Sequence, residues 1–415
     1  MNCTERQVIE DFRQKLVRTV DPIAIATTLY LQKHCKRELF EKIRDKSDKK
    51  SSREQIWNTF LPNIILFCQF GSFWLALYTS GYELLSIELL LQFWQQNLNT
   101  ELTADQSHTE CEKQGYFLLL KVSFHDRAFR EPHELLYKTL EGHRTKYEEA
   151  INTREKVCAA DRYADCLCVV IDTKAMEFIG KLPTHELFDN LKAIIPETSN
   201  TSLTEVGYYS RLAIAHGMAD MFEEGRRFVT KAQMAAFQIN QSAQYVYNML
   251  YIHIHFLCMQ ASIPKSADID GIIDVAKRFL QSIPDQDEGA VFWKKMVALR
   301  IVCFLLGISH KGHINEKQKV EKKHVALAKT FLEVIDARWD RIEYIRRLFY
   351  FVCQARIQEL DFQEHRGKDK NAVERLELAI DQLQGTVAKD PENTFRETPF
   401  ATCYISRLRQ LISKT

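Results

Sequence analysis

The sequence predicts an all-α protein, and two observations support this fold class. Glycine and proline are scarce, with 14 and 9 residues in a chain of 415. Apolar residues recur at three- and four-residue spacing along most of the chain, and no run of alternating β-branched residues is bounded by hairpin turns. We therefore expect a six-helix bundle at the N-terminus, followed by an α-solenoid of helix pairs.

The overall composition predicts a cytoplasmic protein. The 56 basic and 55 acidic side chains nearly cancel, so no broad field attracts nucleic acid or an anionic membrane. The first residues lack the features of a signal peptide, and the longest apolar run, over 64–77, is shorter than the roughly 20 residues that a bilayer requires. The 11 scattered cysteines contain no C-x-x-C pair and suit reduced thiols. We expect no nucleic-acid or membrane partner.

A polar segment over 97–115 divides the chain. It is almost free of large apolar groups and therefore cannot repay the entropy of ordering by burial. We expect a bundle domain over 1–95, a polar linker over 96–113 and a helical-repeat domain over 114–415.

The first four helices of the bundle follow from stripes and caps. Residues 5–20 carry one apolar stripe, and Asp21-Pro22 then supplies an N-cap with proline at the first helical position. A third helix is expected over 36–45. In the fourth, Ser51 or Ser52 caps the N-terminus and Pro62 is expected to end the helix.

The stretch 73–90, FWLALYTSGYELLSIELL, predicts the fifth and sixth helices. We expect them to divide at Gly81, which can adopt the left-handed conformation that closes many helices. Six short amphipathic helices in about 95 residues need a common core. The expected core residues are Phe12, Leu16, Leu29, Phe40, Ile43, Phe60, Phe73, Leu77, Leu85 and Leu89.

These six segments resemble a caspase-recruitment domain (CARD) of the death-fold superfamily. The resemblance rests on LFEKIR in the third helix, on LP at the expected end of the fourth, and on an aromatic-Leu-x-x-Leu-x-x-x-Gly pattern from Phe73 to Gly81. It covers under a quarter of the chain. NIILFCQ departs from the pattern, because it replaces a short polar loop before the fifth helix. A death-effector domain or a death domain is the alternative within the superfamily.

The resemblance implies a binding module that associates with other CARDs, often head to tail. In such contacts a basic surface from helices one and four meets an acidic surface from helices two and three. The matching basic residues here are Arg13, Arg18 and Arg53, and the matching acidic residues are Asp21, Glu38, Glu41 and Asp45. Charges on amphipathic helices are ordinarily just solvated, and lysines at 42, 46, 49 and 50 dilute the acidic set.

The rest of the chain reads as successive helix pairs with a period near 35 to 50 residues, which is typical of helical solenoids. A last helix over 400–414 could cap the array. The expected pairs are 141–180 with 184–194, 203–218 with 220–237, 241–260 with 268–282, 288–308 with 321–336, and 338–361 with 370–388.

One pair resembles a tetratricopeptide repeat (TPR). The matching packing positions are Tyr209, Leu212, Ala213, Gly225, Val229 and Ala232. Small residues are required where two antiparallel helices cross closely. A weaker match lies over 371–380, and the other pairs match poorly, so an irregular helical bundle is the alternative. In TPR proteins the concave face holds peptides or protein segments, which implies a second protein partner here.

The sequence argues against an enzyme. The stretch 307–314 has the glycine spacing of a phosphate-binding loop, but His313 stands where its lysine belongs. The motifs G-x-S-x-G and H-E-x-x-H do not occur. CLC at 166–168 and HIH at 253–255 do not predict a metal site, because residues two apart on a helix point in different directions. We expect no catalytic residue, metal or cofactor.

Two functions remain open. The first is a signalling adaptor whose N-terminal domain binds a CARD-containing protein, such as a caspase or an immune sensor, or its own copies in an oligomer or filament. Its helical array would bind a second protein or hold the first domain inactive. By family resemblance this places the chain in the regulation of apoptosis or innate immunity. The alternative is a TPR-like scaffold whose bundle has no death-fold partner; RNA binding is disfavoured by the charge.

Overall fold

The computed structural model describes residues 1, 3–49, 51–82, 85, 86, 89, 92, 132–174, 185–239, 244–261, 266–282, 288–336, 344–365, 369, 371–393, 395 and 397–414. These residues form 17 α-helices and one short 3-10 helix, Ile195–Glu197. No strand occurs among them, only an isolated bridge between Ile308 and Ile314. The predicted all-α class is confirmed.

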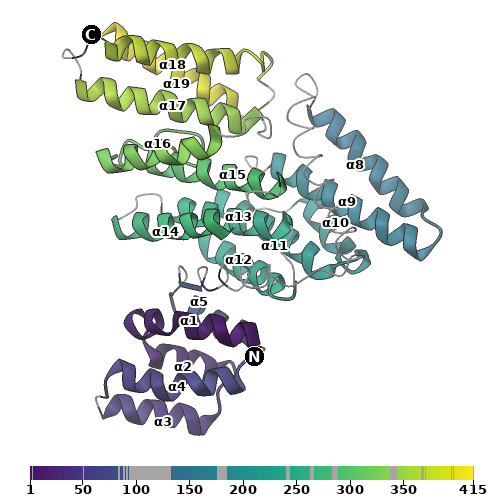
Figure 1. The fold of residues 1–415 in the computed structure, drawn as a ribbon. Coiled ribbons are helices and arrows are strands. Elements are labelled where there is room, and N and C mark those ends of the chain that lie inside the picture. The colour runs from purple at the N-terminus through teal and green to yellow at the C-terminus, as the bar shows by residue number, and fades with distance from the viewer. Residues whose placement is uncertain are drawn as a thin grey trace.

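The N-terminal bundle, drawn in purple in Figure 1, contains five described helices. They are α1 Cys3–Thr19, α2 Pro22–Leu31, α3 Arg37–Asp48, α4 Arg53–Phe67 and α5 Phe70–Thr79. The predicted caps are confirmed: Asp21 accepts from the Ile23 N–H, and Ser52 forms a capping box with Gln55. Gly81 has a φ of +88°, as expected. The predicted sixth helix lies largely outside the described residues. The four positions of it that are described, 85, 86, 89 and 92, are helical.

The predicted core of the bundle is buried, with one partial exception. Nine of the ten expected residues are buried, whereas Phe40 is half-buried and stacks on Tyr30 with ring centroids 4.6 Å apart. Two tryptophans were not among the expected core residues, yet both are fully buried. Trp57 Nε1 donates to the Val20 carbonyl at 3.0 Å, and Trp74 Nε1 donates to the Ser86 carbonyl at 2.9 Å. These bonds satisfy the buried indole N–H groups.

The prediction that Pro62 ends the fourth helix is wrong. Helix α4 continues to Phe67, with Pro62 inside it and Cys68 as the C-cap. Proline removes one backbone donor from the helical ladder. Pro62 is exposed, and the Asn63 side chain donates to the Thr59 carbonyl at 2.8 Å beside the break. The helix therefore loses one bond at its solvent face and keeps its apolar stripe, which includes the buried Ile64.

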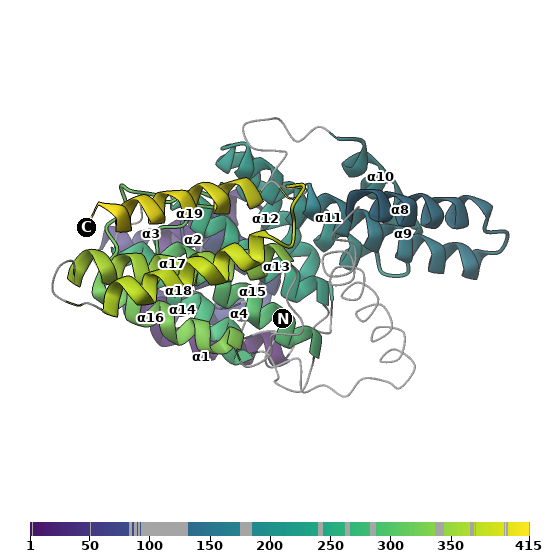
Figure 2. The same ribbon diagram turned by 90° about the horizontal axis from the view of Figure 1, so that it is seen from above.

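The remaining described helices form an array that extends away from the bundle (Figure 1). They are α8 Pro132–Glu149, α9 Thr153–Thr173, α10 Glu186–Ile194, α11 Thr201–Met218, α12 Phe222–Ala236, α13 Gln244–Gln260, α14 Ser266–Ser282, α15 Glu288–Leu305, α16 Lys322–Asp336, α17 Tyr344–His365, α18 Asn371–Val387 and α19 Glu397–Ser413. Consecutive helices pack as pairs, and α11, α13, α15 and α17 pack on one another in that order. Seen from above, α8–α10 extend to one side (Figure 2).

The prediction of one helix over 141–180 is wrong. The region contains two helices, α8 and α9, that pack against each other. They are separated by residues 150–152, where Asn152 takes an extended conformation and its side chain accepts from the Glu155 N–H. Asparagine favours this capping position over a helix interior, so the chain restarts there. The last residues of the predicted helix, 175–180, lie outside the described residues.

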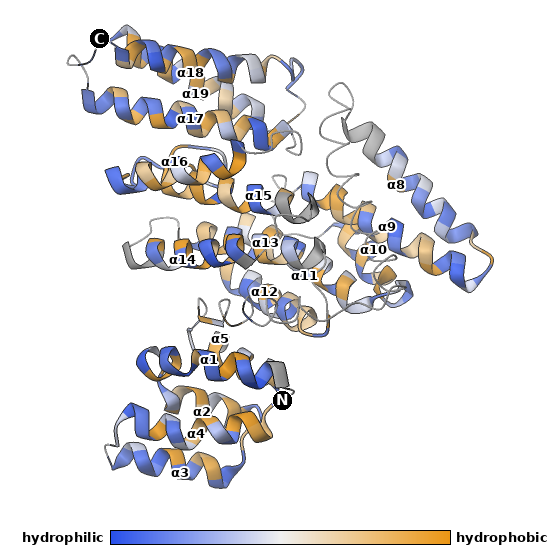
Figure 3. Ribbon diagram, viewed as in Figure 1, coloured by the Kyte–Doolittle hydropathy of each residue, from blue (hydrophilic) through white to orange (hydrophobic). Residues whose placement is uncertain are grey.

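The bundle and the array meet through aromatic rings. Phe237, just after α12, lies 5.4 Å from the ring of Phe70 and 5.1 Å from that of Trp74, both on α5 and both in edge-on geometry. Such pairs contribute about 0.5–1.5 kcal/mol beyond the area they bury. Figure 3 shows that helices on both sides of this junction carry hydrophilic and hydrophobic residues, as amphipathic helices must.

Candidate protein-binding surfaces

The three predicted basic residues lie together along the seam between α1 and α4. Arg53 Nη1 donates to the Arg18 carbonyl at 2.7 Å, and Arg13 Nη2 donates to Asn58 Oδ1 at 2.9 Å. All three arginines are exposed, and Arg13 lies 3.6 Å from Glu10. Exposed ion pairs of this kind contribute little stability, so the guanidinium groups remain available to a partner. We call Arg13, Arg18 and Arg53 the basic seam.

The four predicted acidic residues are divided between two helices. Asp21 caps α2, and its carboxylate is engaged by a backbone N–H. On α3, Glu38 is exposed, Glu41 accepts from Arg37 at 2.8 Å, and Asp45 lies 2.8 Å from Lys49. The hydrogen bond from Arg37 lowers the pKa of Glu41. The acidic residues therefore form no single cluster. On α3, Glu38, Glu41 and Asp45 are spaced three and four residues apart and share one exposed surface.

A cavity of about 670 Å³ lies beside the α2–α3 turn and α4. Its walls include the apolar side chains Leu39 and Phe67 and the cationic side chains Lys33, Lys36 and Lys42. Phe67 is 66% exposed, and the Lys36 ammonium lies 5.3 Å from its ring centroid. The sequence did not predict this cavity, because Pro62 was expected to end the fourth helix and Phe67 lies five residues beyond it.

The six predicted TPR-like packing residues lie where α11 and α12 pack together. Five of them are buried, and the partly buried Tyr209 stacks on Phe228 with centroids 6.3 Å apart. The need for a small residue is clearest at Gly225, where a Cβ atom would come within 3.2 Å of the Ala213 carbonyl oxygen. The same Cβ would meet Phe256 of α13 at 2.5 Å. Gly225 is thus required by two neighbouring helices.

Arg211 is a buried charge that the sequence did not predict. Its guanidinium donates to the Cys168 carbonyl at 3.0 Å, to the Asn248 Oδ1 at 3.2 Å and to the Asp172 carboxylate at 2.9 Å. These partners belong to α9 and α13, so Arg211 joins three helices. The signal in the sequence was the position of Arg211 within a largely apolar helix, which indicates a buried charge. Its partners, about 40 residues away in the chain, could not be read from local periodicity.

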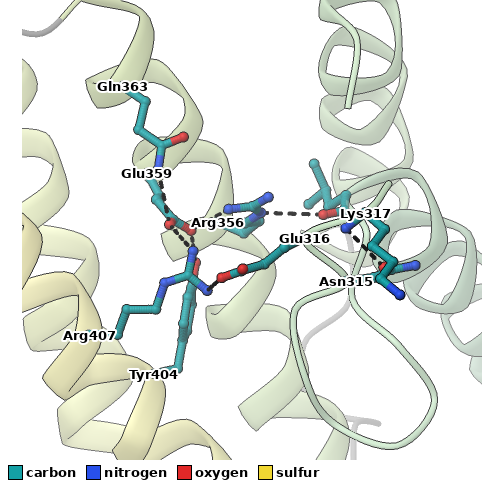
Figure 4. Close-up of polar contacts among 9 residues, drawn as sticks. Asn315, Glu316, Lys317, Arg356, Glu359, Gln363, Tyr404 and Arg407 are labelled. Atoms are coloured by element: carbon teal, nitrogen blue, oxygen red, sulfur yellow. Dashed lines mark hydrogen bonds and ion pairs between the residues drawn. The ribbon is translucent and has the colours of Figure 1, made fainter. Parts of the chain in front are cut away.

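A second buried ionic network surrounds Glu359 of α17 (Figure 4). The carboxylate, 0% exposed, accepts from Arg356 at 2.6 Å, Tyr404 at 2.7 Å and Arg407 at 3.0 Å. Arg356 also donates to the Leu306 carbonyl at 3.3 Å. Burial, followed by the nearby Glu359 charge, raises the pKa of Tyr404 well above its ordinary value. Every strong contact of the buried charge is therefore internal, which indicates a structural role that fixes α17, α19 and the segment after α15.

The histidines and cysteines of interest lie in the interior of the array. Burial lowers the pKa of His253 to about 3, and His253 contacts Gln233 of α12. Cys166 and Cys168 are buried free thiols, and burial raises the pKa of Cys166 to about 12. Within the described ranges, no three His, Cys, Asp or Glu side chains gather in a way that could hold a metal ion. None of the described helices is both long and apolar enough to span a membrane.

Comparisons with models of protein families, with curated proteins and with solved structures found no match to this chain.

Proposed function

We propose that this protein is a non-enzymatic signalling adaptor. Its N-terminal bundle associates head to tail with CARD-containing proteins or with its own copies, and its TPR-like array binds a second protein. By the resemblance of its first 95 residues, the pathway is the regulation of apoptosis or innate immunity. The observation that carries the proposal is the exposed basic seam of Arg13, Arg18 and Arg53 on one side of a compact helical bundle.

The placement of the acidic residues supports head-to-tail association. Figures 1 and 2 show α1 and α3 on opposite sides of the bundle. The basic seam belongs to α1 and α4, whereas Glu41 and Asp45 belong to α3. A contact between unlike surfaces on opposite sides leaves one free surface of each kind at the ends. Such a contact does not close on itself and therefore propagates into a filament.

One observation favours the alternative, a scaffold whose bundle has no death-fold partner. Phe70 and Trp74 of the bundle pack edge-on against Phe237 of the array. A bundle that packs on the array through these aromatic rings can serve as the first unit of the array. It need not be an independent recruiting module. The basic seam on α1 and α4 stays exposed beside this junction, so the adaptor remains the preferred function.

Self-association of the full chain tests the proposal. Light scattering and electron microscopy over a range of protein concentrations should reveal oligomers or filaments. High salt should weaken them, because the screening length falls from about 10 Å at 0.1 M to about 3 Å at 1 M. Arg13→Glu should remain monomeric, whereas Lys329→Glu, a matched charge reversal at an exposed site on α16, should assemble normally. A wild-type chain that is monomeric at every concentration and does not bind an isolated CARD would favour the scaffold.

A further inference from the structure

A second cavity, of about 640 Å³, lies within the array and is distinct from the surfaces described above. Its walls come from the α11–α12 turn, the end of α13, α15 and the segment over 306–321. That segment is ordered by backbone bonds, from the Asn315 N–H to the Gly307 carbonyl at 2.7 Å and from the Ser309 N–H to the His313 carbonyl at 2.9 Å. The Arg356 and Glu359 network contacts this segment at Leu306, through Arg356, and at Glu316, through Arg407.

The charges that line the cavity do not balance. The two carboxylates among its described lining residues are already paired, Asp220 with Lys311 at 2.6 Å and Glu316 with Arg407 at 3.3 Å. Arg300, His310, His313 and Lys317 also line it, and none of the described carboxylates lies within ion-pair distance of them. The cavity therefore has an excess of cationic and hydrogen-bond-donating groups.

Arg300 and His310 each have a buried side-chain nitrogen that a bound ligand could satisfy. The Arg300 Nε and the His310 Nε2 are buried, and neither has a hydrogen-bond partner in the described part of the chain. Buried polar groups in native proteins are nearly always satisfied, and an uncompensated buried charge is costly. Burial, together with the Arg300 charge, lowers the pKa of His310 to about 4. The positive charge of Arg300 beside these hydrogen-bond donors would favour an anion.

We propose that this cavity binds a small organic phosphomonoester, with its phosphate held by Arg300 and His310. Three features select this class of ligand. A planar guanidinium suits the tetrahedral oxygens of phosphate, and His313 and Lys317 add donors beyond those that a single carboxylate would use. The cavity volume lies in the range of about 300–1,000 Å³ that is typical of small-molecule sites, far above the need of inorganic phosphate. Phe222, Met259 and Phe304 supply an apolar wall for the organic part.

Calorimetric titration of the full chain with AMP, adenosine, inorganic phosphate and succinate tests the proposal. AMP should bind, inorganic phosphate should bind more weakly, and adenosine and succinate should not bind detectably. Arg300→Gln should weaken AMP binding by about 10-fold or more, which corresponds to the loss of a charge-assisted hydrogen bond. His310→Gln should also weaken the binding of AMP. Lys329→Gln, which removes an exposed charge outside the cavity, should leave the affinity unchanged.

The stability of the variant without ligand provides an independent check. Because none of the described carboxylates pairs with Arg300, Arg300→Gln should unfold at the same temperature as the wild type or at a higher one. The proposal is overturned if the wild type binds no phosphate compound at millimolar concentration, or if adenosine or succinate binds as well as AMP. It is also overturned if the folded Arg300→Gln variant keeps its affinity for AMP, or if Arg300→Gln fails to fold, which would make Arg300 a structural charge.

Discussion

The ring of Phe256 lies so close to Gly225 that a Cβ atom at position 225 would come within 2.5 Å of its Cε2 atom. Phe256 is 1% exposed and makes an edge-on contact with Phe222. Gly217 lies near the same ring, and a Cβ atom there would be 3.4 Å from the Cδ2 and Cε2 atoms of Phe256. One aromatic ring of α13 thus packs against two glycines, one on α11 and one on α12. The absence of a side chain at these glycines allows the three helices to approach closely.

Gly225→Ala should therefore destabilise the array. Overpacking typically costs about 1–3 kcal/mol, whereas alanine gains about 1 kcal/mol over glycine within a helix, so a net loss of up to about 2 kcal/mol is expected. Chemical denaturation followed by circular dichroism measures it. Gly142→Ala on α8 is the matched control, because a Cβ there meets no atom within 4 Å, and it should stabilise. Equal effects from the two substitutions would show that the close approach to Phe256 is unimportant.

Glu359→Gln should destabilise the C-terminal helices by about 3–5 kcal/mol, because it leaves the buried Arg356 guanidinium without its counter-charge. The control is Glu316→Gln, which removes a carboxylate that pairs with the same Arg407. Glu316 is 76% exposed, against 0% for Glu359, so its removal should cost less than about 1 kcal/mol. Thermal unfolding of both variants measures the difference. Similar losses would contradict the assignment of the stabilisation to the buried carboxylate.

The buried histidines should make the protein less stable in mild acid. The pKa of His253 is about 3 in the folded chain, because it is buried, and about 6.5 in an unfolded one. Between these values the unfolded chain binds the additional proton, so stability is greatest above about pH 6.5 and falls as the pH is lowered towards 3. The slope is about 1.4 kcal/mol per pH unit for each such histidine.

His253→Asn should accordingly reduce the pH dependence of the free energy of unfolding by about one proton between pH 6 and pH 4. Urea denaturation at a series of pH values measures this slope. The variant will also lose the contact with Gln233, so its stability at pH 7.5 is expected to be lower than that of the wild type. An unchanged slope in the variant would mean that His253 is protonated to the same extent in the folded and unfolded chains.

Local sequence signals predicted much of the fold. Asp21 and Ser52 were recognised as caps because capping depends on residues within one helical turn, and most expected core residues of the bundle are buried for the same local reason, apolar spacing. The prediction at Pro62 was wrong because the effect of a proline on a helix depends on whether the proline is exposed. At an exposed position, the loss of one backbone bond did not outweigh the burial of Ile64 beyond it.

The interior polar sites were not predictable in this way. Arg211 finds its partners on α9 and α13, and Glu359 finds Tyr404 and Arg407 about 45 residues later in the chain. The cavity around Arg300 is assembled from three separate segments of the chain. A single sequence shows which residues are charged. Which of them meet is decided by the stacking order of the helices, which periodicity does not specify.

Mixing two charge-reversed chains tests the central claim, head-to-tail association through the basic seam, most directly. One chain carries Arg13→Glu and Arg53→Glu, and the other carries Glu41→Lys and Asp45→Lys; all four residues are exposed. Each chain alone lacks one of the two surfaces and should be monomeric in analytical ultracentrifugation. An equal mixture should form oligomers of alternating chains, because the unchanged surfaces of the two chains are complementary and the two reversed surfaces are complementary as well. Assembly of either chain alone, or a mixture that stays monomeric, would contradict the account.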